Sequence, residues 1–256
     1  MKSKSSEKIT ALIITLNEEI HMKELLSDLD FADEVIIVDS YSTDNTKAIS
    51  ETFSNVTFVA HKFENYTAQR NFAIEQASND WVLFLDADER LTPKLKAEIL
   101  TVINQDHPDN AYLFYRKFMF KNQVLHFSGW QTDKIYRLFN KNFAHYTMDR
   151  LVHEKLCVEG KTGKLKNKLI HYSYSDYESY KAKMRSYGKF KAQEKYMKKM
   201  KPTSFHIFFH PLYNFLYNYL VRFGFLDGSK GIIICYLNAF SIYVRYVELK
   251  RLWKNV

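Results

Sequence analysis

The chain has 256 residues, of which 46% are hydrophobic and 26% charged, enough to bury the core of one large domain or of one domain with an appendage. Only seven glycines and four prolines occur, which excludes a loop-rich or low-complexity protein. Residues 1–8 are polar and lead directly into a strand pattern, so secretion is not expected. Cys157 and Cys235 lack metal-ligand spacing, which favours free thiols in a reducing compartment.

The charge of the chain is divided unevenly along its length. Residues 1–110 carry 10 basic and 20 acidic side chains, a balance of −10, whereas residues 111–256 carry 27 and 9, a balance of +18. A basic run spans residues 181–201 and contains one acid, Glu194. Such a run is typical of a solvated helix face or of a surface for an anionic partner. Because the N-terminal half is acidic and no recognition motif occurs, nucleic-acid binding is not expected.

In chain order, the N-terminal half alternates strand and helix patterns. Apolar runs predict strands at 9–15, 34–39, 56–60 and 81–85, and amphipathic spacing predicts helices at 18–29, 44–53, 66–77 and 93–104. Ser42 or Thr43 is expected to cap the second helix, and Thr92 with Pro93 to begin the fourth. This alternation predicts an α/β fold with a doubly wound, mostly parallel sheet and a Rossmann-like nucleotide-binding half.

The acidic pair Asp86-Ala87-Asp88 closes the strand pattern 81–85. Two carboxylates at i and i+2 point to the same side of a sheet edge, where open α/β folds bind ligands and where a hard divalent cation can be held. An exposed acidic turn is the alternative, but the buried strand before the pair favours a metal-diphosphate site. No glycine-rich phosphate loop occurs, so a metal or side chains must neutralise the phosphates.

Other polar residues follow the first two expected strands and are predicted to face the same crevice. Thr15, Asn17 and Glu18 follow the first strand, and Asp39 ends the second. Helix capping and turn formation are the alternative roles for Asn17, Glu18 and Asp39. A core strand that ends in an aspartate nevertheless needs a partner for that charge.

Four sequence blocks, in the same order along the chain, resemble the motifs of a known family. The blocks are Thr15-Leu16-Asn17-Glu18-Glu19, Val38-Asp39-Ser40-Tyr41-Ser42-Thr43-Asp44, Gln69-Arg70-Asn71 and Leu85-Asp86-Ala87-Asp88-Glu89. Together they are similar to the family 2 glycosyltransferases of GT-A fold, and more closely to the bacterial lipopolysaccharide core group that includes the WaaE-type enzymes. The resemblance spans roughly residues 9–175 and continues more weakly to the C-terminus.

The resemblance implies roles for individual residues. Thr15, Asn17 and Glu18 would border the nucleotide, Asp39 would hydrogen-bond the base, and Arg70 would lie near the diphosphate or the sugar. Asp86 would approach the ribose, and Asp88 would bind Mg²⁺ or Mn²⁺. His171 would provide a further metal or diphosphate contact, with a structural role as its alternative. The whole nucleotide-sugar site expected in this way comprises Thr15, Leu16, Asn17, Glu18, Asp39, Ser42, Gln69, Arg70, Asp86, Ala87 and Asp88.

Residues 111–175 are expected to form the acceptor side. By resemblance the sugar is transferred with inversion, so a carboxylate must take a proton from the acceptor hydroxyl. Asp133, four residues before Arg137, is the first choice for this base and Glu154 is the rival, while an ordinary salt bridge is the alternative for both. Trp130, Arg137 and His153 are candidates for contacts with the sugar or the acceptor, although Trp130 could equally be a core residue.

The C-terminal third has a different pattern from the rest. In residues 205–222 a polar residue recurs every four positions along an otherwise aromatic and aliphatic helix, and residues 230–250 are similarly apolar. Neither stretch contains about 18 uninterrupted apolar residues, so a spanning helix is disfavoured. With the basic run, these helices predict in-plane docking on the anionic inner face of the cytoplasmic membrane. Packing on the catalytic domain or a homodimer through these helices is the alternative.

These observations together predict a GT-A catalytic domain at 1–175, with a nucleotide-sugar half at 9–110 and an acceptor half at 111–175, followed by a helical, amphipathic extension at 176–256. The predicted function is an inverting, metal-dependent transferase that moves a hexose, with glucose as the best guess, from a UDP sugar to a lipopolysaccharide core or another lipid-linked envelope acceptor. A cytoplasmic location, peripheral on the membrane, is expected. Two alternatives are a sugar nucleotidyltransferase, which would carry a glycine-rich basic loop after the first strand, and a non-catalytic scaffold.

Overall fold

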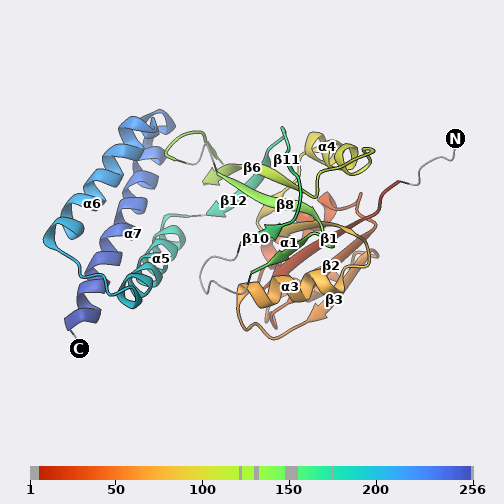
Figure 1. The fold of residues 1–256 in the computed structure, drawn as a ribbon, viewed down its shortest axis with the longest axis horizontal. Coiled ribbons are helices and arrows are strands. Elements are labelled where there is room, and N and C mark those ends of the chain that lie inside the picture. The colour runs from red at the N-terminus through yellow and green to blue at the C-terminus, as the bar shows by residue number, and fades with distance from the viewer. Residues whose placement is uncertain (1–5, 121–122, 130–132, 148–154, 175, 255–256) are drawn as a thin grey trace. The chain divides into compact units, whose positions relative to one another are not determined.

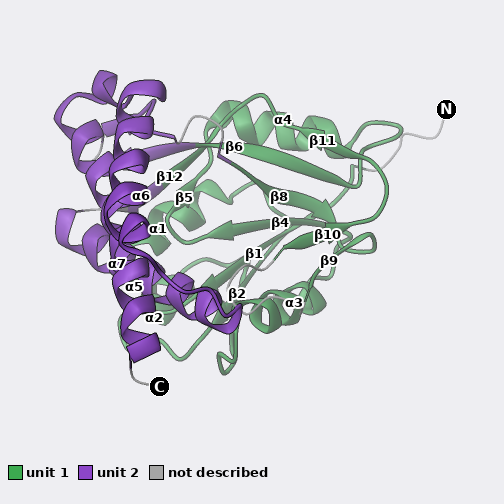
Figure 2. Cartoon of the chain, turned by 60° about the vertical axis from the view of Figure 1, so that its left-hand side comes forward, with its two compact units in different colours: residues 1–116, 134–171 green, residues 117–133, 172–256 purple. Residues whose placement is uncertain are grey.

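The computed structural model describes residues 6–120, 123–129, 133–147, 155–174 and 176–254 (Figure 1). The chain forms two compact units, which Figure 2 colours separately. Unit 1 comprises residues 1–116 and 134–171, and unit 2 comprises residues 117–133 and 172–256. Residues 117–133 therefore group with the C-terminal helices, whereas the predicted functional division at residue 175 stays a prediction.

Unit 1 is built on parallel strands in the order β3-β2-β1-β4, which confirms the predicted α/β fold. These strands are β1 (Ile9–Thr15), β2 (Glu34–Asp39), β3 (Val56–Ala60) and β4 (Trp81–Asp86). The register pairs Thr15 with Asp39 and Ile14 with Asp86. The polar ends of β1, β2 and β4 therefore lie at one edge of the sheet.

Helices cover both faces of this sheet because the apolar residues of each strand alternate between the faces. On one face, Ile9, Ala11 and Ile13 pack against α1 (Glu19–Asp28) and α4 (Pro93–Ile103). On the other face, Leu12 and its neighbours pack against α3 (Tyr66–Gln76) and the hairpin of β9 (Ala144–Tyr146) with β10 (Leu156–Val158). Such two-sided burial is why β1 and β4 are almost continuously apolar.

Antiparallel strands extend the sheet beyond β4. β8 (Lys134–Asn140) pairs with β4, and β6 (Ala111–Phe120) pairs with β8. β12 (Leu169–Tyr174) pairs with the short β5 (Glu89–Arg90), which follows β4 after a two-residue turn. β7 (Gln123–Leu125) pairs antiparallel with β6, whereas β11 (Thr162–Lys164) pairs with β6 in parallel. The pairing of β12 with β5 brings His171 next to the turn that contains Asp88.

Two helix starts were tested by the structure. Thr92 Oγ1 accepts a hydrogen bond from Leu95 N at 3.2 Å, which confirms the predicted cap of α4. The predicted cap of the second helix is wrong: α2 (Thr46–Ser50) begins after Asn45, without a side-chain cap from residue 42 or 43. Both hydroxyls are instead used by loop partners, since Ser42 Oγ donates to Asp39 and Thr43 Oγ1 donates to Asn17.

Unit 2 is mainly helical. Its helices are α5 (Tyr177–Met197), α6 (Ser204–Leu216), the π-helical turn η2 (Tyr217–Val221), the 3₁₀ turn η3 (Gly224–Asp227) and α7 (Gly228–Lys254). Gly188 lets α5 approach α7 closely, because a Cβ there would lie 2.7 Å from the carbonyl oxygen of Ser241. A buried cluster of Phe118, Phe120, Tyr180, Met184, Ile234 and Leu237 joins β6 to these helices within the unit.

Residues 224–254 form a stretch that is, by length and composition, long and apolar enough to cross a membrane, the one such helix in the described part of the chain. The sequence analysis disfavoured a spanning helix because polar residues such as Asn238 and Ser241 interrupt this apolar stretch. The average composition of the stretch nevertheless satisfies the length and hydropathy of a span. Leu237, Tyr246 and Leu249 of α7 are buried inside unit 2. The core helix of a compact unit needs the same composition, so α7 by itself does not define a membrane span.

Candidate active site

The turn after β4 is built around a carboxylate that two arginines bind. Arg70 Nη2, on α3, donates to Asp86 Oδ1 at 3.1 Å, and Arg137 Nη2, on β8, donates to Asp86 Oδ2. Arg137 also donates to Glu89 Oε1 at 2.8 Å, and Glu89 Oε2 accepts from the backbone N–H of Asp86. Arg116 lies 3.7 Å from the same glutamate. The strand end is therefore held in place by buried, hydrogen-bonded charge pairs.

Burial and charge act in opposite directions on these groups. Burial alone would raise the pKa of Asp86, but the Arg137 and Arg70 guanidiniums outweigh it and hold that pKa well below its usual range. Burial raises the pKa of Glu89, against the opposing effect of Arg137. Asp86 is consequently an ionised carboxylate whose two oxygens are both occupied by arginine.

Asp88, the second acid of this turn, contacts a histidine, whereas Asp86 is bound by the two arginines. His171 Nε2 lies 3.2 Å from Asp88 Oδ2, and the pairing of His171 with Glu89 across β5 and β12 fixes this approach. The Asp88 side chain keeps 22% of its surface exposed. Carboxylate oxygen is a ligand for Mg²⁺ and Mn²⁺, and imidazole nitrogen is a ligand for transition metals, which favours Mn²⁺ for this pair; Mg²⁺ is held by one or two carboxylates plus substrate phosphates.

The residues present thus fit a metal that is shared with a diphosphate rather than a metal enclosed by protein. Within the described ranges, no group of three or more His, Cys, Asp or Glu side chains could hold an ion by itself. Asp88 and His171 can supply two ligands, which leaves the remaining positions for phosphate oxygens and water. Asp86 is already bound by Arg70 and Arg137, so it does not add a third.

The loops after β1 and β2 are joined by a second hydrogen-bond network. Asp39 is buried; its Oδ1 accepts from the hydroxyls of Thr15 and Ser42, and its Oδ2 accepts from Ser42 N at 2.7 Å. Asn17, at a left-handed φ of 57°, donates its N–H to Ser42 Oγ and accepts from Thr43 N. This network satisfies the Asp39 charge and shapes the loop, while its predicted contact with a base stays a prediction.

The neighbouring predicted residues lie around this loop. Leu16 is exposed at its tip, and Glu18 donates its N–H to Thr46 Oγ1 at 2.9 Å. Gln69 is buried and donates from Nε2 to Ser40 Oγ at 3.2 Å, while its Oε1 lies 2.9 Å from His61 Nδ1. Asp39 and Asp86 end strands on either side of β1, which places them about 10 Å apart across the same edge.

The acceptor-side residues divide into described and undescribed positions. Trp130, His153 and Glu154 lie outside the described residues. Asp133 is half-buried in unit 2 and immediately precedes β8. The acceptor contact predicted for Arg137 stays a prediction; in this structure its side chain is fully buried between Asp86 and Glu89.

Sequence reasoning missed two charged residues of this site, Glu89 and Arg116. Glu89 stood in the quoted block next to the acidic pair but was given no role. A signal existed, because a third acid directly after a buried strand and an acidic pair is expected to need a cationic partner if it is buried. Arg116 lies with Lys117 in an otherwise aromatic and aliphatic strand, where a cation is the corresponding signal.

A family model described as glycosyl transferase family 2 matches residues 10–163, more than half of the chain. The chain belongs to glycosyl transferase family 2. This glycosyltransferase is 30% identical to the glycosyltransferase RC0292 of Rickettsia conorii, over 98% of this chain and 92% of the relative. It is 26% identical to the lipopolysaccharide core biosynthesis glycosyltransferase LpsC of Rhizobium meliloti, over 93% of each chain.

Among solved structures, the glycosyltransferase is similar to S. aureus TarS 1-349 in complex with UDP. The TM-score is 0.48 and the sequence identity 17%, over 97% of this chain and 92% of that chain.

Proposed function

We propose that this glycosyltransferase is an inverting, metal-dependent hexosyltransferase that uses a UDP sugar, with UDP-glucose as the first donor to test. The observation that carries the proposal is the division of roles at the strand end. Two arginines hold Asp86 in place, whereas Asp88 and His171, 3.2 Å apart, remain as a ligand pair at the carboxyl edge of the sheet. The choice of uracil and glucose rests on the resemblance to the WaaE-type group.

The chemistry needs charge stabilisation where the nucleoside diphosphate departs. A divalent metal held by Asp88 and His171 would supply that stabilisation when bound. The residues of the chain keep the ligand pair in register: Arg137 and Arg70 fix the end of β4, and the β5–β12 pairing fixes His171. The loop network of Asn17, Asp39 and Ser42 forms the adjoining wall of the proposed nucleotide pocket.

Inversion requires a carboxylate that removes the proton of the acceptor hydroxyl as the new glycosidic bond forms. We propose Asp133 for this role. It precedes β8, the strand that also carries Arg137, and its oxygen would take the acceptor proton while the sugar–phosphate bond breaks. Glu154 remains the rival base.

The proposed acceptor is a lipopolysaccharide core or another lipid-linked envelope glycan. Support comes from the relative LpsC, which is named as a lipopolysaccharide core biosynthesis glycosyltransferase and aligns over 93% of this chain. Acceptors of this kind are anchored in a membrane, so an enzyme that acts on them benefits from a membrane-binding surface.

Helix α6 supports such a surface because its amphipathicity is reversed. The polar stripe predicted from the sequence is half-buried and faces the protein: His210 Nδ1 lies 3.0 Å from Tyr246 Oη, and Arg222 donates to Gly129 O at 2.9 Å. The aromatic side of the helix faces solvent, with Phe208 and Tyr213 each 67% exposed. A large exposed apolar face is typical of a membrane or protein interaction site.

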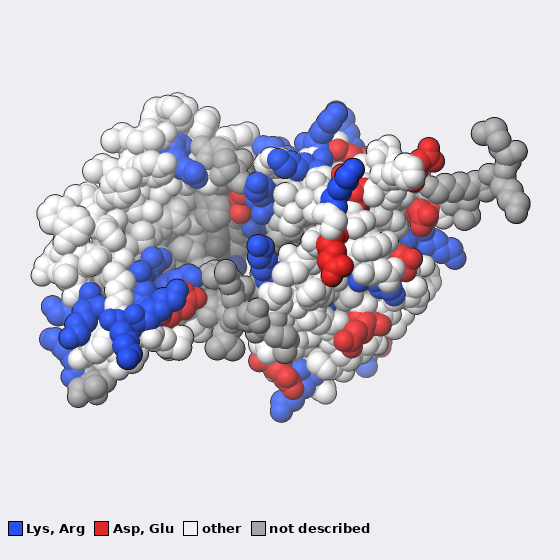
Figure 3. All heavy atoms as spheres, in the orientation of Figure 1, with Lys and Arg blue, Asp and Glu red and all other residues white. Residues whose placement is uncertain are grey.

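The charge pattern around α6 fits an anionic lipid surface. Figure 3 shows Lys and Arg side chains gathered beside a broad uncharged area over the C-terminal helices. The basic run of α5 provides Lys181, Lys183, Arg185, Lys189, Lys191 and Lys195. We therefore propose a cytoplasmic enzyme that docks peripherally on the inner face of the membrane, through this unit.

A donor panel tests the proposed reaction. The purified chain is incubated with several nucleotide sugars, with Mg²⁺ or Mn²⁺ or with a chelator, and the release of nucleoside diphosphate is measured with and without a lipopolysaccharide core acceptor. We expect metal-dependent release that is fastest with UDP-glucose, and a product whose anomeric configuration is opposite to that of the donor. Retention of configuration, or equal rates with the chelator, would refute the mechanism.

A further inference from the structure

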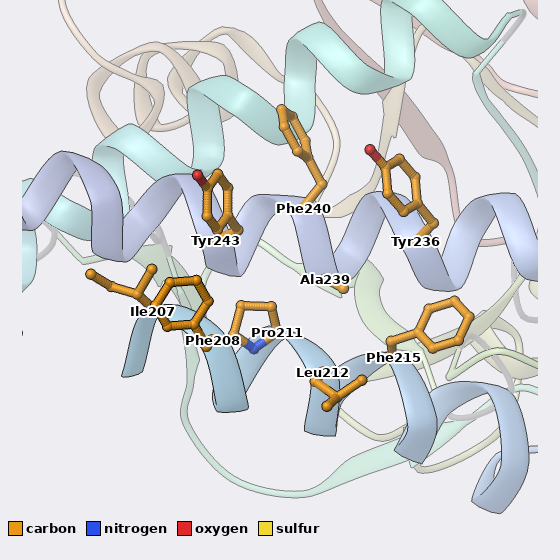
Figure 4. A pocket seen from close by; sticks show the side chains of 9 residues that line it. All are labelled: Ile207, Phe208, Pro211, Leu212, Phe215, Tyr236, Ala239, Phe240 and Tyr243. Atoms are coloured by element: carbon orange, nitrogen blue, oxygen red, sulfur yellow. The ribbon is translucent and has the colours of Figure 1, made fainter. Parts of the chain in front are cut away.

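An apolar groove runs between α6 and α7 within unit 2. Its volume is about 400 Å³, and its lining comes from both helices, as Figure 4 shows. Residues of α6 contribute Ile207, Phe208, Pro211, Leu212 and Phe215, and residues of α7 contribute Tyr236, Ala239, Phe240 and Tyr243. Two tyrosine hydroxyls are the polar side-chain groups in this lining. The volume falls in the range of about 300–1,000 Å³ that is usual for small-molecule sites.

A cluster of basic side chains adjoins this groove around the buried ring of Tyr246. Lys195 Nζ lies 5.6 Å from the centre of that ring, and the rings of His206 and His210 lie 5.1 and 5.4 Å from it. Arg245 is the preceding residue on α7, and its Nε atom is buried without a hydrogen-bond partner among the described residues. The cluster therefore gathers cationic and imidazole groups from α5, α6 and α7.

The acids near this cluster are already engaged. Glu194 binds Lys191 at 2.9 Å, and Glu248 binds Arg251 at 2.7 Å. Burial lowers the pKa of Lys195, and the neighbouring Arg245 and Lys198 lower it further, whereas Glu194 acts in the opposite direction. Burial likewise lowers the pKa of His210, followed by the effects of His206, Lys195 and Arg245. Mutual repulsion of this kind is relieved when an anion binds among the cations.

The groove and the cluster follow one another along the same pair of helices. His206 and His210 immediately precede the groove residues Ile207 and Pro211 on α6, and Tyr246 lies three residues after the groove residue Tyr243 on α7. An amphiphile could thus place an anionic group at the cluster and an apolar chain in the groove.

We propose that unit 2 binds one anionic membrane phospholipid, with its phosphate at the cluster formed by Lys195, His206, His210 and Arg245 and one hydrocarbon chain in the α6–α7 groove. This inference rests on the proposed membrane attachment and assigns it a defined lipid site. Charge complementarity selects the occupant. A second copy of the chain related by a two-fold axis would bring the same cations toward one another, which disfavours a homodimer through this face.

Photochemical labelling of the full chain tests the site. The probe is phosphatidylglycerol that carries a photoactivatable group in its acyl chain, diluted into phosphatidylcholine vesicles, and labelled peptides are mapped by mass spectrometry. We expect labels on residues 207–215 and 236–243. The same photoactivatable chain on phosphatidylcholine is expected to label these peptides about tenfold less, because phosphatidylcholine lacks the net negative charge that the cations attract.

Two variants separate the site from general electrostatic attraction. Groove labelling is expressed per vesicle-bound chain, so that weaker general attraction to the vesicle does not count. Lys195→Gln with Arg245→Gln is expected to reduce it about tenfold, whereas Lys181→Gln with Lys183→Gln, the same change of charge on the basic run of α5, weakens co-sedimentation but leaves it within about twofold. Leu212→Trp fills the groove from its exposed side and is expected to abolish labelling while vesicle co-sedimentation continues. Circular dichroism of each variant checks that the helices are retained.

The outcomes distinguish the lipid site from the functions on which it rests. Co-sedimentation with anionic vesicles without groove labelling, or equal losses in both double variants, overturns the lipid site and leaves membrane attachment intact. Absence of co-sedimentation overturns both, whereas nucleoside diphosphate release, measured separately in solution, reports on the transferase alone. A dimer in light scattering that Leu212→Trp dissociates, without labelling, would identify a second copy as the occupant.

Discussion

Arg137 and Glu89 form a fully buried ion pair, with Nη2 of the arginine 2.8 Å from Oε1 of the glutamate. The same nitrogen binds Asp86, so one guanidinium group holds two acidic side chains on either side of the turn that presents Asp88. Asp86 and Glu89 therefore serve the structure of the turn, whereas Asp88 is the carboxylate proposed to bind the metal.

Replacement of Arg137 is expected to destabilise the fold. Arg137→Met leaves Glu89 buried without its closest partner and should lower the free energy of unfolding by about 3–5 kcal/mol, measured by urea denaturation. Lys47→Met removes an exposed ion pair with Glu51 and should cost less than about 1 kcal/mol. Equal losses in the two variants would contradict the structural role of the buried pair.

Replacement of Asp88 is expected to affect activity rather than stability. Asp88→Asn should reduce metal-dependent nucleoside diphosphate release by about 10²–10³-fold, the usual cost of one lost charge-stabilising group. It should also weaken Mn²⁺ binding in the presence of UDP, measured by calorimetry. Asp106→Asn, an exposed acid after α4, is the matched control. A fully active Asp88→Asn enzyme would rule out the metal assignment.

The pH dependence of stability is expected to include Glu34 at the start of β2. Burial would raise its pKa, but hydrogen bonds from Ser78 N, Thr10 Oγ1 and Ser78 Oγ lower it below its ordinary value. A depressed folded-state pKa stabilises the protein above the unfolded value of about 4.3 and ceases to do so as the pH falls through the folded value. The stability difference between wild type and Glu34→Gln should therefore be largest near neutrality and shrink below pH 4 or so. A stability difference that grows as the pH falls would contradict a lowered pKa of Glu34 in the folded protein.

Asp227 is expected to order the loop that precedes Asp133. Its carboxylate accepts from His126 N at 2.9 Å, Phe127 N at 3.0 Å and Ser128 Oγ at 3.2 Å, all within unit 2. Asp227→Asn should accelerate hydrogen exchange at residues 126–128 by about tenfold or more, because hydrogen bonds to a charged group contribute about 1.5–3 kcal/mol. Exchange in β1 serves as the internal reference and should not change.

The exposed aromatic face of α6 is expected to drive vesicle binding. Phe209→Ser with Tyr213→Ser removes two exposed rings that do not line the groove, and should reduce co-sedimentation with anionic vesicles by at least about tenfold. Phe63→Ser with Phe143→Ser removes two exposed rings from unit 1 and provides the matched control. If both double variants bind equally well, α6 is not the docking surface.

Local patterns in the sequence were sufficient to predict the strands of the parallel part of the sheet. Strands β1, β2 and β4 are long apolar runs, and Thr92 with Pro93 is a strong helix start, so both were predicted closely. The cap of α2 could not be predicted in the same way. Ser42 is a good capping residue, but the buried Asp39 charge competes for its hydroxyl more strongly.

The arrangement of the candidate site depends on pairings that no local pattern encodes. Asp86 meets Arg137 51 residues later, and Asp88 meets His171 83 residues later, through antiparallel strands whose order is set by the whole sheet. The polar stripe of α6 was visible in the sequence, yet its inward direction was not. Helical periodicity defines a face of a helix but not the neighbour that covers it.

The reversed amphipathicity of α6 also bears on how the purified protein behaves in solution. A row of exposed aromatic side chains is typical of an interaction surface or an aggregation liability. We therefore expect the folded chain to aggregate non-specifically in dilute buffer and its solubility to rise with detergent or lipid. The face that would anchor the enzyme therefore sets a handling requirement, and a yield recovered without amphiphile should be dominated by aggregates rather than by monomers.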